Sequence, residues 1–594
     1  MPRSALARLR RFSAPLLVAV AALAVALVAP LARAAAPAAK PNIVIVLVDD
    51  AGYGDFSCHG HPFLKTPHID RLHAESVRLT DFHVAPMCSP TRGQLLTGAH
   101  GLRTGVTSVT SARTYLRPEF VTAPQMLAAA GWRTGIFGKW HLGDSYPHRP
   151  MDKGFQTAVW TKGWGFTSAP EFSNVLVEGR VIRGDQPEKF PGYITDFCFD
   201  EAMTWMRRQR DAAAPFFCYI PLHAAHTPHT VPEKYLAPFA GKPAPAFFAM
   251  LANIDENMGR LETFLRDTGL RDNTVVLFMT DNGGTAGVRT YNAGLRAGKI
   301  TYYEGGHRVP CFIRWPAGGL RPPGDVAALT QVQDILPTLL AFTGVPKPAG
   351  PAFDGLDLAP LLRGTADALP DRTLVVQYGP GAGQKDTTGP KKFQSAVLRG
   401  PWRLVHGTEL YDVSTDRAQE KDLAAARPEI VADLRRRYEE WWATVAPRLD
   451  DYVPVSLGAA VQPVVELTSS DWQDAYADNS NHVRNAVGGP RGGPWHVQVE
   501  RAGDYEIELR RWPFDLAAPL DGNVTPPGKA LPIAAAQLAV AGQTHRAATK
   551  PGDLGARFRL RLPAGRTTLQ AWFQDAAGAD LCGAYFAQVA YRAP

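Results

Sequence analysis

The sequence predicts an α/β protein with a largely parallel sheet, followed by a smaller α+β region and then by an all-β sandwich. Three observations support this fold class. Short apolar runs at residues 43–48, 216–222 and 275–279 are rich in β-branched or aromatic residues, and each is too short for a helix. Amphipathic segments of helical character lie between them, as in an alternating β and α chain. After Pro454, apolar and polar residues alternate with a period of two, and glycine and proline clusters separate the segments.

The first 34 residues have the pattern of a signal peptide. Four arginines among the first 11 residues precede an apolar run at 16–31, and Ala32-Arg33-Ala34 places small residues at the spacing that signal peptidase recognises. The run is rich in alanine and short for a membrane span. We therefore predict a signal peptide at residues 1–34, export to the periplasm or the medium, and no stable membrane span after cleavage. An uncleaved anchor is the alternative, and Arg10-Arg11 resembles a twin-arginine signal only faintly.

Composition argues against some classes of protein. The 594 residues carry a formal net charge of +7, but acidic residues are interleaved throughout and no long Lys/Arg run follows the leader. We therefore predict no nucleic-acid partner. Six cysteines are too few for a disulfide scaffold in a chain of this length. Cys198, Cys218 and Cys311 lie in apolar segments and are predicted to be buried, inert thiols. Cys88 differs, because its neighbours form a polar turn, Met-Cys-Ser-Pro-Thr-Arg.

The remaining elements are assigned in chain order. In the α/β region, residues 41–349, helices are predicted between the strands, at residues 68–76, 124–130, 247–266 and 332–343. In the next region, residues 350–450, a hairpin at 397–405 and the segment Glu409-Leu-Tyr-Asp412 precede a helix at about 429–445. The tail, residues 455–594, has strand-like segments and no convincing helix, so it is predicted to be a separate β-sandwich.

Polar residues follow two of the buried strands. Asp49 and Asp50 come directly after the strand at 43–48, and Asp281 and Asn282 come after the run at 275–279. Each aspartate alone is more readily explained as a helix cap or a turn residue. Together, three carboxylates and one amide oxygen at the carboxyl edge of a parallel sheet suit a hard divalent cation.

Cys88 opens the segment Cys88-Ser-Pro-Thr-Arg92, and residues 93–97 are predicted to form the helix that follows. On its residues alone, the segment is also explained as a capped helix start with an incidental thiol. It resembles the signature at which sulfatases have a cysteine oxidised to formylglycine by a dedicated maturation enzyme. The usual fourth residue is serine, so Thr91 is a departure, but the Cys-x-Pro-x-Arg core is intact.

Other motifs of the same family follow in the family's order. They are the first strand with its Asp pair at 41–54, Gly138-Lys-Trp-His-Leu-Gly143, His226-Thr-Pro, Asp281-Asn-Gly-Gly284, and Gly298-Lys299 through the run at 303–310. The resemblance covers about residues 41–445 and is to the type I, arylsulfatase A-like sulfatases; several independent motifs argue against a chance match. It implies an alkaline-phosphatase-like mixed sheet flanked by helices, with a smaller C-terminal subdomain.

The resemblance also implies roles. The cation, calcium with magnesium as the alternative, would be held by Asp49, Asp50, Asp281 and Asn282. Formylglycine made from Cys88 would hydrate to a geminal diol, and one of its hydroxyls would attack the sulfur. Arg92 would support that diol electrostatically, and His141 would take a proton from it. The second hydroxyl would then expel sulfate as the aldehyde reforms, an exit that a plain thiol lacks.

The remaining roles concern the sulfate and the leaving group. Lys139 and Lys299, with the metal, would neutralise charge on the sulfate oxygens, which is where prearranged cations stabilise a transition state most. His226 would assist the departing alcohol or phenol, as a proton donor with Lys299. His226 is preferred to His229 because only His226-Thr-Pro has the family's spacing, and His223 is left unassigned.

The predicted function is therefore hydrolysis of sulfate monoesters, with a sulfated carbohydrate as the natural substrate. One alternative is a phosphate or phosphonate monoester hydrolase of the same superfamily, and another is a carbohydrate-binding protein with a vestigial catalytic domain. The second alternative depends on the tail, where Trp472, Trp495, Trp512 and Trp572 would either stack on sugars or pack in a core. We expect the tail to be an accessory module that supports the rim of the active site.

Overall fold

Ten strands form one mixed sheet in the order β10-β2-β9-β8-β1-β7-β3-β4-β5-β6. The computed structural model describes residues 40–379 and 389–592, so the predicted signal peptide lies outside the described residues. The central strands β1, β7, β8, β3 and β4 pair in parallel, whereas β9 is antiparallel to β2 and β8, and β5 is antiparallel to β4 and β6. The mixed sheet confirms the predicted fold class. The strands are β1 (Asn42–Val48), β2 (Val77–His83), β3 (Arg133–Lys139), β4 (Thr157–Thr161), β5 (Arg180–Arg183), β6 (Gln186–Lys189), β7 (Phe216–Pro221), β8 (Thr274–Thr280), β9 (Cys311–Arg314) and β10 (Gly324–Gln331).

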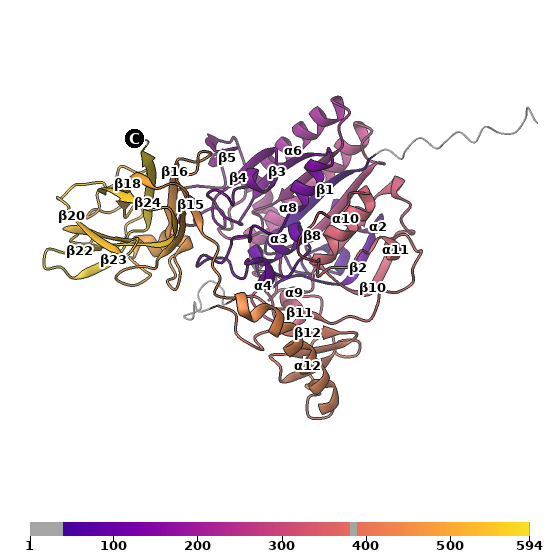
Figure 1. Ribbon diagram of the computed structural model, residues 1–594. Coiled ribbons are helices and arrows are strands. Elements are labelled where there is room, and N and C mark those ends of the chain that lie inside the picture. Colours follow the sequence, from indigo (N-terminus) through magenta and orange to yellow (C-terminus); the bar gives the residue numbers. More distant parts are fainter. Residues whose placement is uncertain (1–39, 380–388, 593–594) are drawn as a thin grey trace, which may run out of the picture. The chain divides into compact units, whose positions relative to one another are not determined.

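Both faces of the central strands are buried, as their continuous apolar runs predict. In β1, Val44, Val46 and Val48 enter one core, whereas the alternate residues enter the other. The first core is closed by α2 (Pro67–Ala74), α6 (Ile194–Asp211) and α8 (Pro245–Asp267), and the second by α3 (Cys88–Thr97), α5 (Ala123–Ala129) and α10 (Ile335–Thr343). The helices thus cover the two faces of the sheet in two layers (Figure 1).

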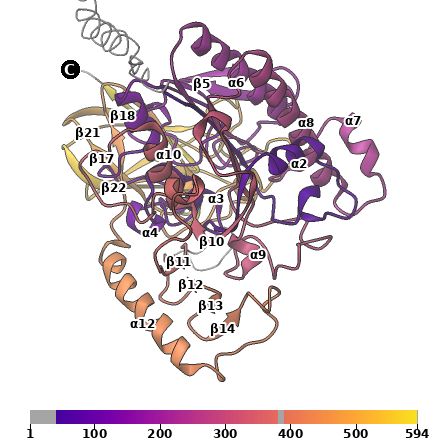
Figure 2. The ribbon, with the colours of Figure 1, turned by 90° about the vertical axis from the view of Figure 1, so that its right-hand side faces the viewer.

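A smaller antiparallel sheet follows, in the order β11-β12-β13-β14. Its strands are β11 (Leu374–Val376), β12 (Ala396–Arg399), β13 (Trp402–Val405) and β14 (Glu409–Asp412). The helix α12 (Pro428–Val445) covers one face (Figure 2). On that face, Leu434 and Tyr438 pack on alternate strand residues. The other face shares a core with Met87 and Cys88. This small sheet therefore packs beside the segment that carries the predicted nucleophile.

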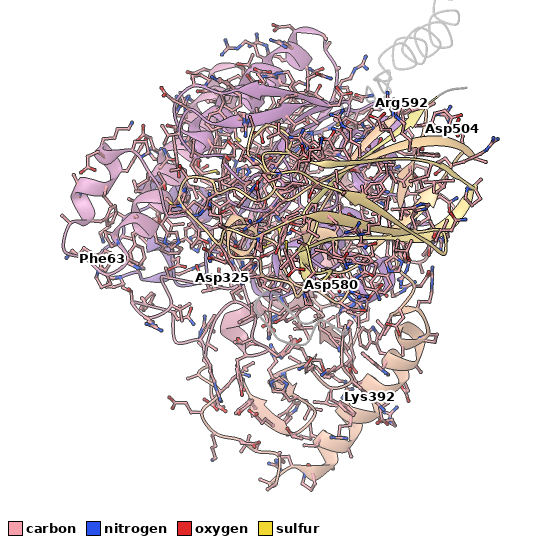
Figure 3. The ribbon with its side chains drawn as sticks, turned by 90° about the vertical axis from the view of Figure 1, so that its left-hand side faces the viewer. Phe63, Asp325, Lys392, Asp504, Asp580 and Arg592 are labelled. Atoms are coloured by element: carbon pink, nitrogen blue, oxygen red, sulfur yellow. The ribbon has the colours of Figure 1, made fainter. Side chains whose placement is uncertain are left out.

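The C-terminal residues form two further sheets around one core. One contains β15 (Val455–Leu457), β17 (Trp495–Val499), β19 (Ala535–Val540), β20 (Gln543–Ala548), β22 (Gly565–Gln574) and β23 (Asp580–Gly583), and the other contains β16 (Val464–Thr468), β18 (Gly503–Arg510), β21 (Ala556–Leu562) and β24 (Phe586–Arg592). Asp504 and Arg592 are register partners on β18 and β24 (Figure 3).

Two details of the tail go beyond the sequence-based expectation. The four tryptophans considered as sugar-stacking or core residues are all buried: Trp472, Trp495 and Trp512 belong to the sandwich core, whereas Trp572 lies outside that cluster, against the guanidinium of Arg491. A short helix, α13 (Ser480–Arg484), was not predicted; the side chain of Asn479 caps it by accepting from the backbone N–H of His482. Within the two described ranges, no helix has both the length and the apolar character to cross a bilayer.

A buried ion pair joins the small sheet to the large one. Arg403 on β13 donates to Glu304 at 2.8 Å and to Asp81 at 2.9 and 3.1 Å, and all three side chains are largely buried. Burial alone would raise the pKa of Glu304, but Arg403, with smaller contributions from His83 and Arg308, lowers it. Arg403 likewise lowers the pKa of Asp81 against the effect of burial. The pair depends on both carboxylates being ionised.

Replacing Arg403 by methionine should therefore destabilise the fold by about 3–5 kcal/mol, because two buried carboxylates lose their partner. The folded-state pKa values are lowered, so the contribution is present above the unfolded values of about 4 and is lost as the pH falls through and below them. Urea unfolding should show a large wild-type minus variant difference at pH 7 that shrinks in acid. The exposed pair between Arg399 and Asp371 gives the control, since Arg399→Met should cost about 1 kcal/mol or less. An equal cost for the two variants would contradict the prediction.

Candidate active site

The carboxyl ends of β1 and β8 bring four predicted ligands together. Asp49 and Asp50 follow β1, Asp281 and Asn282 follow β8, and these strands are parallel neighbours. The backbone N–H of Asp50 donates to Asp281 Oδ1 at 3.3 Å, and Asn282 Nδ2 donates to Asp50 Oδ1 at 3.0 Å. All four residues are buried. Donor atoms of Asp49, Asp50, Asp281 and Cys88 all lie within 4.8 Å of one another.

The chemistry of this group fits a divalent cation that prefers oxygen ligands. Asn282 Oδ1 is buried and has no hydrogen-bond partner among the described residues. An amide oxygen left in this state beside three carboxylates is costly unless a cation binds it. Burial, followed by the charge of Asp49, raises the pKa of Asp281 to about 6, so the charged form of this carboxyl is disfavoured without a further positive charge beside it. The donors present are therefore suited to calcium or magnesium.

Three cationic side chains surround the carboxylates. Lys139, at the end of β3, donates to Asp49 Oδ2 at 2.5 Å, and Lys299 donates to Asp50 Oδ1. Arg92 donates to Asp281 Oδ2 at 2.8 Å and reaches Asp49 Oδ2 at 3.3 Å. Burial opposes ionisation of Asp49, but Lys139 and the other cations hold its pKa well below the usual value. The carboxyl edge of the sheet therefore contains buried carboxylates and buried cationic side chains in direct contact.

Cys88 is the first residue of α3 and lies against this group. Its Sγ is 3.6 Å from Asp49 Oδ1 and 3.3 Å from Lys299 Nζ. Burial, and then the charge of Asp49, raises the pKa of the thiol. The helix begins five residues earlier than the predicted 93–97, because Met87 is extended and Pro90 is tolerated in a first turn. One turn later on the same helix, Arg92 faces the same carboxylates.

His141 follows β3 and has a left-handed backbone conformation, with φ of 59°. Its Nε2 lies 3.1 Å from the carbonyl oxygen of Val109, and its Nδ1 is buried without a hydrogen-bond partner among the described residues. The side chain of Ser89, next to Cys88, donates to the carbonyl of His141 at 2.8 Å. Burial, with Lys139 and Arg92, lowers the pKa of His141, so its imidazole is neutral near pH 7.

His226 lies at the acidic edge, with Nε2 at 3.8 Å from Asp50 Oδ2 and Nδ1 at 2.7 Å from the carbonyl oxygen of Thr227. The ring of Trp164 packs on it at a centroid distance of 5.2 Å. His229 packs on Phe247 at a ring-centroid distance of 5.6 Å. His223 is held by Thr161 Oγ1 at 2.7 Å in the same neighbourhood.

Two groups in this arrangement were not identified from the sequence. The carbonyl of Val109 sets the environment of His141, and the ring of Trp164 that of His226. Every residue has a backbone carbonyl, so the residue type at position 109 does not reveal this role. Trp164 lies in a loop whose path depends on contacts with residues distant in sequence. The ten predicted residues themselves all lie at or beside the carboxyl edge of the sheet.

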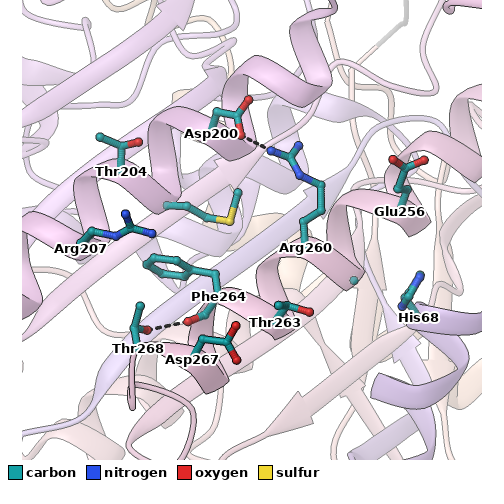
Figure 4. Close-up of a pocket in the computed structure, with 12 residues that line it drawn as sticks. His68, Asp200, Thr204, Arg207, Glu256, Arg260, Thr263, Phe264, Asp267 and Thr268 are labelled. Atoms are coloured by element: carbon teal, nitrogen blue, oxygen red, sulfur yellow. Dashed lines mark hydrogen bonds and ion pairs between the residues drawn. The ribbon is translucent and has the colours of Figure 1, made fainter.

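A separate groove of about 580 Å³ lies between α6 and α8 (Figure 4). Asp200 pairs with Arg260 there, and the guanidinium of Arg207 lies 5.6 Å from the centre of the Phe264 ring. None of the ten predicted site residues lines this groove. It offers no nucleophile beside a set of metal ligands, so the carboxyl edge of the large sheet is the candidate active site.

Comparisons with known proteins identify the family. The Sulfatase family model matches residues 41–345. Arylsulfatase A of Homo sapiens is 34% identical over 471 residues, which cover 68% of this chain and 88% of that protein. N-acetylgalactosamine-6-sulfatase of Sus scrofa is 32% identical over 354 residues, covering 54% and 66% respectively. The solved structure of Ps i-CgsB in complex with k-i-k-neocarrahexaose has a TM-score of 0.60 and 25% identity, and covers 68% of this chain and 92% of that one. The chain therefore belongs to the type I sulfatase family and is a sulfuric ester hydrolase.

Proposed function

We propose that this hydrolase carries formylglycine at position 88 and cleaves sulfate monoesters at the carboxyl edge of the large sheet. One observation carries the proposal. The reactive atom of residue 88 lies 3.6 Å from a carboxylate of the ligand set and 3.3 Å from the Lys299 ammonium group. As a hydrated aldehyde, residue 88 would supply one hydroxyl to attack sulfur and a second to expel sulfate.

The cation is proposed to be calcium, with magnesium as the alternative, held by Asp49, Asp50, Asp281 and Asn282. A bound ion would supply Lewis acidity and a fixed point for the sulfate oxygens. The orphaned Asn282 Oδ1 supports this assignment. Lys139 and Lys299 are proposed to neutralise charge on the same oxygens, where the transition state is most sensitive to it.

Proton transfer is assigned to two histidines. Because Val109 accepts a hydrogen bond from His141 Nε2, the lone pair on Nδ1 is available to take a proton from the nucleophile. Arg92 holds its positive charge beside that nucleophile. His226 Nε2 faces the acidic edge, and it is proposed to protonate the leaving oxygen together with Lys299.

The natural substrate is proposed to be a sulfated carbohydrate, since Ps i-CgsB, a protein of related structure, was solved in complex with k-i-k-neocarrahexaose. Residues 1–34 are proposed to be a signal peptide for the periplasm or the medium, and a formylglycine-generating enzyme is the required maturation partner. The chain is proposed to comprise a catalytic domain at 41–349, a subdomain at 350–450 and an accessory β domain at 455–594.

The test combines a mass measurement with substrate selectivity. Protein from an exporting host that contains the maturation enzyme should yield a residue-88 peptide with the mass of formylglycine. The same preparation should hydrolyse 4-nitrophenyl sulfate faster than 4-nitrophenyl phosphate. An unmodified thiol in protein that prefers the phosphate ester would instead support a phosphohydrolase of the same superfamily.

A further inference from the structure

The C-terminal β-module, defined as residues 455–592, contacts two loops of the large α/β region. The first is the loop at residues 107–115, which carries the Val109 carbonyl that accepts from His141 Nε2 at 3.1 Å. Since His141 Nδ1 has no hydrogen-bond partner among the described residues, this one contact decides which ring nitrogen holds the proton. The position of the 107–115 loop therefore bears directly on the chemistry available to His141.

The 107–115 loop is not fixed by its own sequence. Ser111 and Ala112 have φ of 61° and 55°, in the left-handed region, and such residues persist only when their surroundings hold them. The module supplies two of the holding contacts. The carbonyl of Ser470 accepts from the backbone N–H of Ser111 at 3.0 Å. The ring of Tyr115 enters the module's hydrophobic core, and its hydroxyl lies beside the buried carboxyl of Asp471.

Arg113 gives the same loop a third anchor. Its guanidinium donates to the carbonyl of Leu449 at 2.9 Å and to the hydroxyl of Tyr452 at 2.7 Å, and it is almost fully buried. Tyr452 in turn stacks on His496 of β17 with ring centroids 4.4 Å apart and planes at 5°. The segment leading into the module is thus locked to the loop on one side and to the sandwich on the other.

The second loop, at residues 161–172, carries Trp164, whose ring packs on His226. The carbonyl of Asp478 accepts from the backbone N–H of Ala169 at 2.7 Å, and the carbonyl of Thr167 accepts from Ser480 N–H at 2.9 Å. Beside these bonds, Lys162 Nζ lies 3.6 Å from Glu466 Oε2 on β16. One module therefore holds both the loop that orients His141 and the loop that packs on His226.

We propose that the C-terminal β-module is a positioning element of the active site, which fixes His141 through the 107–115 loop and His226 through the 161–172 loop. The proposal rests on the proton-transfer roles proposed above for the two histidines. It also gives the expected accessory module a mechanical role, since Asp471 and Glu466 act through these loops and do not touch the reacting atoms.

The first pair of variants tests the 107–115 loop. Asp471→Ala removes the buried carboxyl beside the Tyr115 hydroxyl, whereas Asp471→Asn keeps a polar group of the same size at that place. A displaced general base costs turnover more than binding, so Asp471→Ala should lower kcat by about 10-fold with KM changed by less than about 2-fold. The loss should be the same on 4-nitrophenyl sulfate and on an alkyl sulfate, because both need the nucleophile. Asp471→Asn should restore most of the activity.

The second pair tests the 161–172 loop by the leaving group. Glu466→Ala removes the partner of Lys162, and Glu466→Gln keeps a polar one. Nitrophenolate departs with little protonation, whereas an alkoxide needs a proton donor. Glu466→Ala should therefore reduce kcat on the alkyl sulfate several times more than on 4-nitrophenyl sulfate. A merely structural loss would reduce both to the same extent.

The matched control is Leu569→Ala on β22, which leaves a cavity in the same sandwich core and removes no polar contact to either loop. It should lower the melting temperature and leave both kcat values near wild type at 25 °C. If Asp471→Ala and Glu466→Ala retain wild-type kcat, or lose activity only in proportion to stability as the control does, the proposal is overturned. Full activity of His141→Ala and His226→Ala is a different outcome, because it would remove the proposed proton-transfer roles.

Discussion

Replacement of Cys88 by alanine is expected to abolish sulfate-ester turnover, lowering kcat on the order of 10⁴-fold or more. The side chain carries the only proposed nucleophile, and the surrounding cations cannot replace the bond that it forms to sulfur. The loss should appear in kcat measured with 4-nitrophenyl sulfate, at unchanged folding by near-UV circular dichroism. Sulfate hydrolysis at wild-type rates by Cys88→Ala would show that the nucleophile lies elsewhere.

Two further variants make this result specific. Cys88→Ser supplies a single hydroxyl, which has no second hydroxyl to expel sulfate, so any attack should end in a stable sulfated serine visible by mass spectrometry. Cys311→Ala removes another buried thiol, on β9, and should keep kcat near wild type. Equal losses for Cys88→Ala and Cys311→Ala would indicate damage to packing instead of chemistry.

Removal of a proposed metal ligand should have the second largest effect. Asp281→Ala is expected to lower kcat/KM by about 10³-fold, because a bound divalent cation contributes several kcal/mol of charge stabilisation. The variant also leaves Arg92 without its 2.8 Å partner, so Arg92 would lose part of its fixed position. Chelation of the wild-type protein should give a similar loss that added calcium reverses.

Binding can be measured without activity. Calcium should raise the melting temperature of the wild-type protein by mass action, because only the folded chain brings the four ligands together. Asp281→Ala should show no such rise, whereas Asp504→Ala, at an exposed carboxylate on β18, should behave like wild type. A calcium-dependent rise that survives Asp281→Ala would place the ion at another site.

Much of the large sheet could be predicted, because its strands have a local signature. The apolar runs at 43–48 and 275–279 lie within β1 and β8. Both faces of these strands are buried, so their residues are continuously apolar and the strands can be recognised from that run alone. The helix α6 was not predicted, since its second half, with Arg207, Arg208 and Arg210, masks the apolar stripe of its first half. Edge strands such as β5 and β6 are short and polar. Their extended conformation depends on hydrogen bonds to the neighbouring strand more than on the intrinsic β-propensity of their residues.

The candidate site also has a part that the sequence predicts and a part that it does not. Side chains at strand ends, such as Asp49 and Asp281, could be placed together because parallel strands end at one edge. The environment of His141 could not, because it depends on a backbone carbonyl in a loop that is held by residues more than 300 positions later, among them Ser470. Contacts between residues so far apart in the chain cannot be recognised from a local sequence pattern.

The burial of Cys88 constrains when its proposed oxidation can take place relative to folding. In the folded protein the thiol is 2% exposed, at the start of a helix whose every residue is buried. Under the maturation proposed above, an enzyme would have to reach Cys88 and its neighbours, and in the folded protein those residues are packed in the interior. The proposed oxidation is therefore expected to precede folding, while the segment is still extended. A molecule that folds first would keep its thiol, and refolding the purified protein would not make it competent.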